Sequence, residues 1–250
     1  MPKRSLRLLA CLALLLLVAG CSIGKKQAKQ ADVHFMLGLS GLSDQNPTMA
    51  LTEFLKASEL APDRADIQDA LGQAYYLKQA YPKAEQHFLK AIELDPQNGQ
   101  YENNLAALYL NQQRWDQAIQ HFLKAAHNLF FANPEIPLTG AGFANVQKGN
   151  YVDAIGLYRE AINHNPRYAQ AYLRLGETYY TMGKTSLALE EYSKALELYP
   201  GYPEAHYRLG VAYLKQHQPD KAQQHFQEVL KNAPDSEFAR QSTDYLKLLR

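Results

Sequence analysis

Residues 169–202 read AQAYLRLGETYYTMGKTSLALEEYSKALELYPGY, and the order of small and large side chains predicts two short helices packed back to back. In the first helix, Gly176 leaves room for a neighbouring backbone, while Tyr192 supplies bulk in the second. Gly183 is expected to end the first helix, because glycine adopts the left-handed conformation without steric cost. Pro200 cannot continue the second helix. The segment therefore predicts a helical hairpin.

The same order recurs along most of the chain. An alanine opens each predicted second helix, at intervals of 34, 34, 36, 34 and 34 residues: Ala50, Ala84, Ala118, Ala154, Ala188 and Ala222. Twelve residues before each alanine stands a small residue: Gly38, Gly72, Ala106, Gly142, Gly176 and Gly210. Four residues after each alanine stands an aromatic residue: Phe54, Phe88, Phe122, Tyr158, Tyr192 and Phe226. A six-fold match indicates a repeat array in which small residues pack against large ones.

This spacing resembles the 34-residue tetratricopeptide repeat. The resemblance implies an all-α fold, a right-handed superhelical solenoid of six helix pairs closed by a C-terminal capping helix. The repeats are expected at 31–64, 65–98, 99–134, 135–168, 169–202 and 203–236, and the capping helix at 237–250 with Ser236 as its N-cap. Two extra residues fall between Ala126 and Ala141. The apolar trio Leu129, Phe130 and Phe131 lies there, and we favour a buried plug between helix pairs over a partner-facing role.

The N-terminus has the pattern of a targeting segment. A basic start is followed by an apolar run over 8–18, which is shorter than the roughly 18 residues of a membrane-spanning helix. We therefore expect a signal peptide over 1–20. Residues 18–21 resemble the bacterial lipobox, which implies that Cys21 is lipidated, and Ser22 after it points to the outer membrane by resemblance to lipoprotein sorting. Residues 21–30 are expected to form a lipidated, flexible tether.

Composition restricts the function classes. The chain has 26 basic and 25 acidic residues. Without Lys3, Arg4 and Arg7 the balance is 23 − 25 = −2, with no basic stripe of a nucleic-acid binder. Only Cys11 and Cys21 are present, so the mature chain is expected to hold no disulfide.

Eight histidines prompt a search for catalytic or metal sites. His87, His121 and His225 take the same slot in different repeats, which places them too far apart to share a metal ion. We interpret them as ordinary surface or rim histidines. No motif predicts a cofactor, a metal or a catalytic site, so we expect a protein that is not an enzyme.

In the tetratricopeptide family, the first helix of each repeat lines a concave groove. Transferring the inward-facing positions gives a predicted partner-binding set: Asp69, Gln73, Tyr76, Asn103, Asn104, Asn111, Phe143, Arg174, Glu177, Tyr180, Tyr207 and Arg208. Repeat one offers a possible apolar partner strip of Phe35, Leu39 and Leu42. Amides and aromatic rings suit an extended or helical peptide. The alternative, that these residues only pack within the solenoid, stays open.

A lipobox, six repeats, the Asn103-Asn104 pair and an irregular apolar turn before repeat four resemble the type IV pilus biogenesis and stability lipoproteins, or pilotins. That resemblance implies a periplasmic scaffold, anchored in the outer membrane, that helps a secretin ring to assemble. The alternative is a lipoprotein adaptor that recruits peptidoglycan hydrolases or other envelope proteins.

Overall fold

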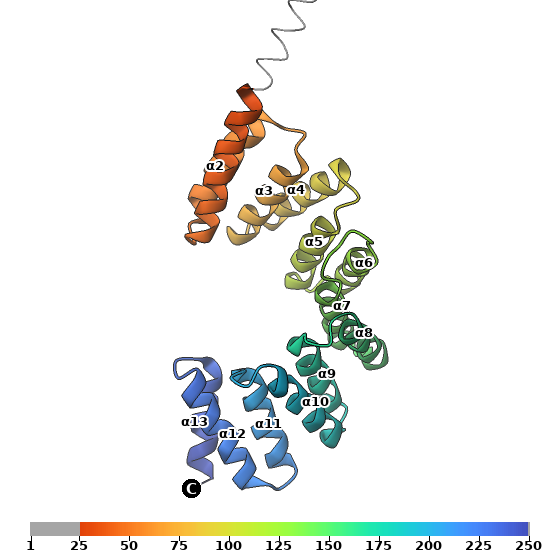
Figure 1. The fold of residues 1–250 in the computed structure, drawn as a ribbon, viewed down its shortest axis with the longest axis vertical. Coiled ribbons are helices and arrows are strands. Elements are labelled where there is room, and N and C mark those ends of the chain that lie inside the picture. Colours follow the sequence, from red (N-terminus) through yellow and green to blue (C-terminus); the bar gives the residue numbers. More distant parts are fainter. Residues whose placement is uncertain (1–25, 250) are drawn as a thin grey trace, which may run out of the picture. The chain divides into compact units, whose positions relative to one another are not determined.

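The computed structural model describes residues 26–249, which form helices without any strand (Figure 1). They fall into two compact units divided at Leu108 and Tyr109, inside one helix. The first unit holds a helix over 26–43, α2 (Pro47–Leu60), α3 (Ala65–Leu77), α4 (Tyr81–Leu94) and most of α5 (Gly99–Asn111). The second holds α6 (Trp115–Ala126), α7 (Glu135–Gln147), α8 (Tyr151–His164), α9 (Ala169–Thr181), α10 (Thr185–Leu198), α11 (Pro203–Lys215), α12 (Pro219–Asn232) and α13 (Glu237–Leu248). The predicted all-α class of six helix pairs and a closing helix is confirmed.

Each helix pair is joined by a tight turn that contains one residue in the left-handed conformation. Gly183 has a φ of 76° and Gly149 a φ of 82°, as expected for glycine after a helix. The other four turns use non-glycine residues with φ between 55° and 59°: Gln45, Gln79, Gln113 and His217. All six stand five residues before the anchoring alanine, so the turn geometry is fixed by the repeat and not by glycine alone.

Within the pairs, glycine makes room for an aromatic ring. A Cβ atom added to Gly176 would lie 2.6 Å from the Tyr192 ring, and one added to Gly72 would lie 2.5 Å from Phe88. Gly38, Gly142 and Gly210 face Phe54, Tyr158 and Phe226 in the same way. The anchoring alanines are all fully buried: Ala50, Ala84, Ala118, Ala154, Ala188 and Ala222. Small and large side chains therefore interlock in both units.

Two expectations about irregular segments were wrong. Residues 26–30, predicted to belong to a flexible tether, are helical and continue into the first repeat, because lysine, glutamine and alanine are good helix formers. The apolar trio is not a buried plug, since Leu129 is 96% and Phe130 77% exposed, while Phe131 is half-buried.

The geometry around the α6–α7 connection explains why no plug is needed. Helix α6 has 12 residues where α4 has 14, so the extra residues extend the connection to 127–134. Gly140 of α7 then lies directly against the Phe122 ring, where an added Cβ would be 2.6 Å from a ring carbon. The two helices meet closely and leave no gap for the trio to fill.

Helix α13 closes the second unit. The side chain of Ser236 accepts a hydrogen bond from the backbone N–H of Ala239, which confirms the predicted N-cap. Tyr245 of α13 stacks on Phe226 with 4.9 Å between ring centroids. The predicted signal peptide and Cys21 lie outside the described residues. None of the helices within 26–249 is both long and apolar enough to cross a membrane.

Candidate functional site

In the first unit, a buried carboxylate organises the predicted groove positions. Asp69 of α3 is 6% exposed and accepts hydrogen bonds from two neutral amides. Gln73 Nε2 donates to it at 2.6 Å, and Asn104 Nδ2 of α5 donates at 2.9 and 3.1 Å. Burial raises the pKa of Asp69 to about 6, and the two amide donors only partly offset that effect. The structure thus brings together three predicted residues from two repeats.

A small hollow lies next to this cluster. It has a volume of about 160 Å³ and is lined by Gln73, Tyr76, Phe88, Asn104, Ala107 and Leu108. The neighbouring Asn103 is half-buried, and its side-chain oxygen finds no hydrogen-bond partner among residues 26–249. The hollow offers an apolar floor with amides at its edge, which is an arrangement that suits a side chain of a bound peptide.

In the second unit, four charged side chains of α9 and α11 pair with one another. Arg174 of α9 contacts Glu177 at 2.6 Å and Glu204 of α11 at 3.3 Å. Arg208 of α11 contacts Glu177 at 2.7 Å and Glu204 at 3.4 Å. Burial opposes the charge of Arg174, but the two glutamates raise its pKa above the usual value. We name these four residues the charge quartet.

The charge quartet borders a hollow of the second unit. This pocket has a volume of about 270 Å³ and is lined by Phe143, Val146, Gln147, Tyr158, Arg174, Glu177, Thr178, Tyr180, Thr181, Tyr192 and Arg208. The guanidinium of Arg174 lies 5.9 Å from the Phe143 ring centroid, and the Lys215 ammonium lies 4.5 Å from that of Tyr180. Aromatic walls and charged rims give the pocket both apolar area and hydrogen-bonding groups.

The remaining predicted positions do not join these two clusters. Tyr207 packs against α13, with ring centroids 5.4 Å from Phe238 and 6.3 Å from Tyr245, so the closing helix covers part of it. Asn111 is exposed at the end of α5. In the apolar strip, Phe35 lies against Phe54, Leu42 is also partly buried, and Leu39 is 38% exposed.

Glu204 was missed by the sequence analysis, although it completes the charge quartet. Its spacing to Arg208, i to i+4 on one helix, was the available signal.

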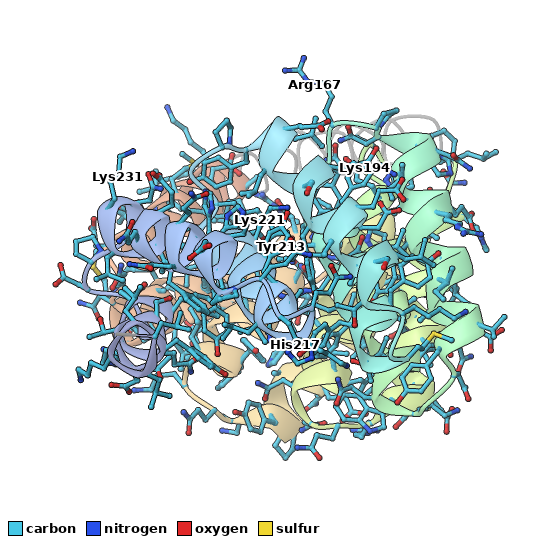
Figure 2. The ribbon with its side chains drawn as sticks, turned by 90° about the horizontal axis from the view of Figure 1, so that it is seen from below. Arg167, Lys194, Tyr213, His217, Lys221 and Lys231 are labelled. Carbon is cyan, nitrogen blue, oxygen red and sulfur yellow. The ribbon has the colours of Figure 1, made fainter. Side chains whose placement is uncertain are left out.

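The interpretation of the histidines as ordinary surface or rim residues was wrong for His206, which is buried and lies against the partly buried His225. His225 Nδ1 lies 3.0 Å from Nδ1 of His206, and Nε2 of His206 lies 2.8 Å from the Pro200 carbonyl oxygen. Burial and the neighbouring His206 lower the pKa of His225 to about 4. His225 also stacks on Tyr213. The Lys221 ammonium lies 5.3 Å from the centroid of the Tyr213 ring. Both residues are labelled in Figure 2.

The same link is built in the first unit. His87 Nδ1 lies 2.8 Å from Gln68 Oε1, and the two residues are 19 positions apart, as His206 and His225 are. His87 also stacks on Tyr75. These histidines fasten the second helix of a pair to the start of the first. Within residues 26–249, no group of three histidine, cysteine or acidic side chains is arranged to hold a metal ion.

These features define an all-α repeat protein in which the first helix of each pair supplies the side chains that line its hollows. Family models described as tetratricopeptide repeats match residues 65–98, 87–120, 142–183 and 182–241, and the chain belongs to the tetratricopeptide-repeat family. The repeats of this family are protein-interaction modules. A search of curated proteins finds no match.

Several solved structures are similar to this chain. PilF of Pseudomonas aeruginosa is 18% identical, with a TM-score of 0.73, over 88% of this chain and 99% of its own. PilW, a widely conserved type IV pilus biogenesis factor, is 16% identical, with a TM-score of 0.75, over 85% of this chain and 98% of its own. YrrB, a tetratricopeptide-repeat protein with an unusual peptide-binding site, is 21% identical, with a TM-score of 0.54, over 76% of this chain and 97% of its own. At these identities the likeness establishes the fold.

Proposed function

We propose that the protein is a periplasmic scaffold, anchored in the outer membrane through a lipid on Cys21, that binds a protein partner and assists the assembly of a type IV pilus secretin. The binding role is supported by the pocket of the second unit, which is lined by aromatic side chains and by members of the charge quartet. Such a pocket is suited to an anchoring side chain of a protein partner.

The chemistry of the pocket indicates how a partner is held. An apolar or aromatic side chain enters between Phe143 and Tyr180 and removes these rings from water. The guanidinium groups of Arg174 and Arg208 are already oriented by Glu177 and Glu204, so they donate to the partner's backbone carbonyls with little further ordering. Preformed donors beside an apolar pocket favour a specific segment over any apolar surface.

The pilus role rests on two further observations. The similar structures PilF and PilW are covered almost end to end, at 99% and 98% of their own lengths. Residues 18–21 also resemble a lipobox ending at Cys21, which is the residue that a lipid anchor requires. One fold can serve several functions, and the experiments below test binding, anchoring and the pilus role separately.

Partner binding is tested with two tyrosine variants. Tyr180→Ala removes a wall of the pocket, and Tyr199→Ala removes a tyrosine that is 54% exposed and does not line it. We expect Tyr180→Ala to weaken co-purification with the secretin of the same cells at least tenfold and Tyr199→Ala to leave it unchanged. Equal retention of the secretin by both variants would contradict the role of the pocket.

Anchoring is tested at Cys21. Metabolic labelling with a clickable fatty acid should mark the wild-type protein in the outer-membrane fraction and leave the Cys21→Ala variant unlabelled and released. A wild-type protein without label would remove the anchor from the proposal.

The pilus role is tested by deleting the gene. Secretin multimers on a denaturing gel and twitching motility should both be lost and should return with the wild-type gene. Normal multimers in the deletion strain, combined with capture of peptidoglycan hydrolases by the protein, would favour the adaptor function instead.

A further inference from the structure

The helix over 26–43 exposes an apolar face that no other described element covers. Val33, Met36 and Leu37 are 52%, 63% and 43% exposed, and their i, i+3, i+4 spacing puts them on one side of the helix. The opposite side packs into the first unit through the fully buried Ala31 and through Gly38. This helix thus has apolar residues on two sides. One side packs against the first unit, and the other is exposed.

The grouping distinguishes this face from the rest of the first unit. Elsewhere in residues 44–108 the exposed large apolar side chains are divided among α2, α3 and α4, and no two of them have the i, i+3 or i, i+4 spacing: Met49, Leu55, Leu77 and Leu89. Isolated exposed apolar residues are ordinary, whereas a contiguous group indicates contact with something outside the chain.

The same face is basic toward its N-terminal end. Lys29 and Lys26 stand four and seven residues before Val33, which places them on the same side of the helix, and both are exposed. Asp32, the nearest acidic residue of the helix, is paired with Arg64 of the first unit, which offsets its charge. A helix with lysines beside an exposed apolar group is the pattern of a segment that lies in the surface of an anionic bilayer.

The position of this face along the chain also favours a membrane. Cys21 precedes the first described residue by 26 − 21 = 5 positions, and five extended residues reach at most about 18 Å. A lipid on Cys21 would therefore hold the start of the helix near the headgroups. This step rests on the anchoring part of the proposed function.

We infer that the face formed by Lys26, Lys29, Val33, Met36 and Leu37 lies on the surface of an anionic phospholipid bilayer. The three apolar side chains enter the boundary between headgroups and acyl chains, and the two lysines contact lipid phosphates. The face adds to the attachment of the lipid-anchored protein and fixes its orientation on the bilayer.

A fluorescent reporter placed on the face tests the inference. Single cysteines at Val33→Cys, Met36→Cys and the control Val152→Cys are labelled with an environment-sensitive dye in a Cys11→Ala background. Val152 is a suitable control because it is 78% exposed and lies in the second unit. Vesicles of phosphatidylethanolamine with phosphatidylglycerol are then added to the lipidated protein and, separately, to the Cys21→Ala form.

We expect the dye at positions 33 and 36 to shift to shorter wavelength in the lipidated protein, with no shift at position 152. A shift in the Cys21→Ala form as well would support the face independently of the anchor. Acyl-labelled protein whose dyes do not shift would overturn the inference while leaving the anchor in place. A shift that depends on protein concentration without vesicles would assign the face to a second copy and overturn it too.

The lysines are tested by charge reversal. Lys26→Glu with Lys29→Glu should weaken partitioning of the Cys21→Ala protein into the anionic vesicles about tenfold or more, because each basic residue near the surface contributes to attraction. Lys83→Glu with Lys90→Glu makes the same charge change on α4 and should have a much smaller effect. Equal loss in the two double variants would show general charge attraction and would overturn the assignment to this face.

Discussion

The two units build the same groove positions with different chemistry. Asn104, Arg174 and Arg208 occupy the sixth position of their repeats, yet Asn104 belongs to a neutral amide cluster around Asp69, while the arginines belong to the charge quartet. Asp69 receives hydrogen bonds but no ion pair among the described residues, so its charge is poorly compensated. The repeat therefore fixes where a side chain stands and leaves its electrostatics free to vary.

The largest predicted effect tests the packing of glycine against an aromatic ring, which the two units share. Gly72→Leu in the first unit and Gly176→Leu in the second should each lower the free energy of unfolding by about 3 kcal/mol, because the new side chain must displace Phe88 or Tyr192. Urea denaturation with circular dichroism measures both losses. Similar values would establish that one packing rule holds the two units.

Gly156→Leu is the matched control for those variants. An added Cβ at Gly156 of α8 meets nothing within 4 Å, so leucine there should stabilise the helix by about 0.5 kcal/mol. If Gly156→Leu lowered the free energy of unfolding as much as Gly176→Leu, the close packing of the paired helices would not be the reason for glycine at position 176.

Much of the fold could be predicted because packing needs an alternation of sizes that is visible in the sequence. The glycines and the aromatic residues that face them stand at constant intervals, and their contacts are local to one helix pair. The left-handed turns were only partly visible, since Gln45, Gln79, Gln113 and His217 adopt a conformation that the sequence signals clearly only at glycine. The apolar trio was misjudged because the early end of α6 at Ala126 leaves no trace in composition.

The candidate site was less predictable because its contacts join residues of neighbouring repeats. Asp69 and Asn104 are 35 residues apart, and Arg174 and Glu204 are 30 apart. The family register places such residues on the same side of their helices, but it does not say which side chains pair. Tyr207 illustrates this point, because it stands at a predicted groove position but its ring packs against Phe238 of α13.

A second prediction breaks the charge quartet. Arg174→Ala leaves Glu177 and Glu204 with Arg208 alone, and we expect the free energy of unfolding to fall by about 2 kcal/mol. Adding Glu204→Gln should recover part of this loss, because it removes the glutamate left without its second cation. Urea denaturation of the single and double variants measures the coupling. If the free-energy losses of Arg174→Ala and Glu204→Gln simply added in the double variant, the two residues would act independently.

A third prediction concerns the effect of Asp69 on stability at low pH. Its pKa in the folded protein, about 6, lies above the value of 3.8 expected in the unfolded chain, so protonation favours the folded state. The carboxyl group should therefore add stability as the pH falls from 6 toward 4, by about 2 kcal/mol. Asp69→Asn cannot titrate, so the stability of the wild type relative to this variant should rise over that range. A difference that is constant with pH would contradict the pKa shift caused by burial.

The smallest of the predicted pH effects has the opposite sign and concerns His225 in the second unit. The pKa of His225, about 4 when folded and 6.5 when exposed, means that the unfolded chain binds the proton first as the pH falls. The wild type should therefore lose about 1 kcal/mol relative to His225→Gln between pH 6.5 and 4, a value reduced because the ring is partly exposed. His217→Gln is the control, since it replaces an exposed histidine with the residue that takes the same turn position as Gln79. If His217→Gln changed the acid response as much as His225→Gln, the contact between His206 and His225 would not be its source.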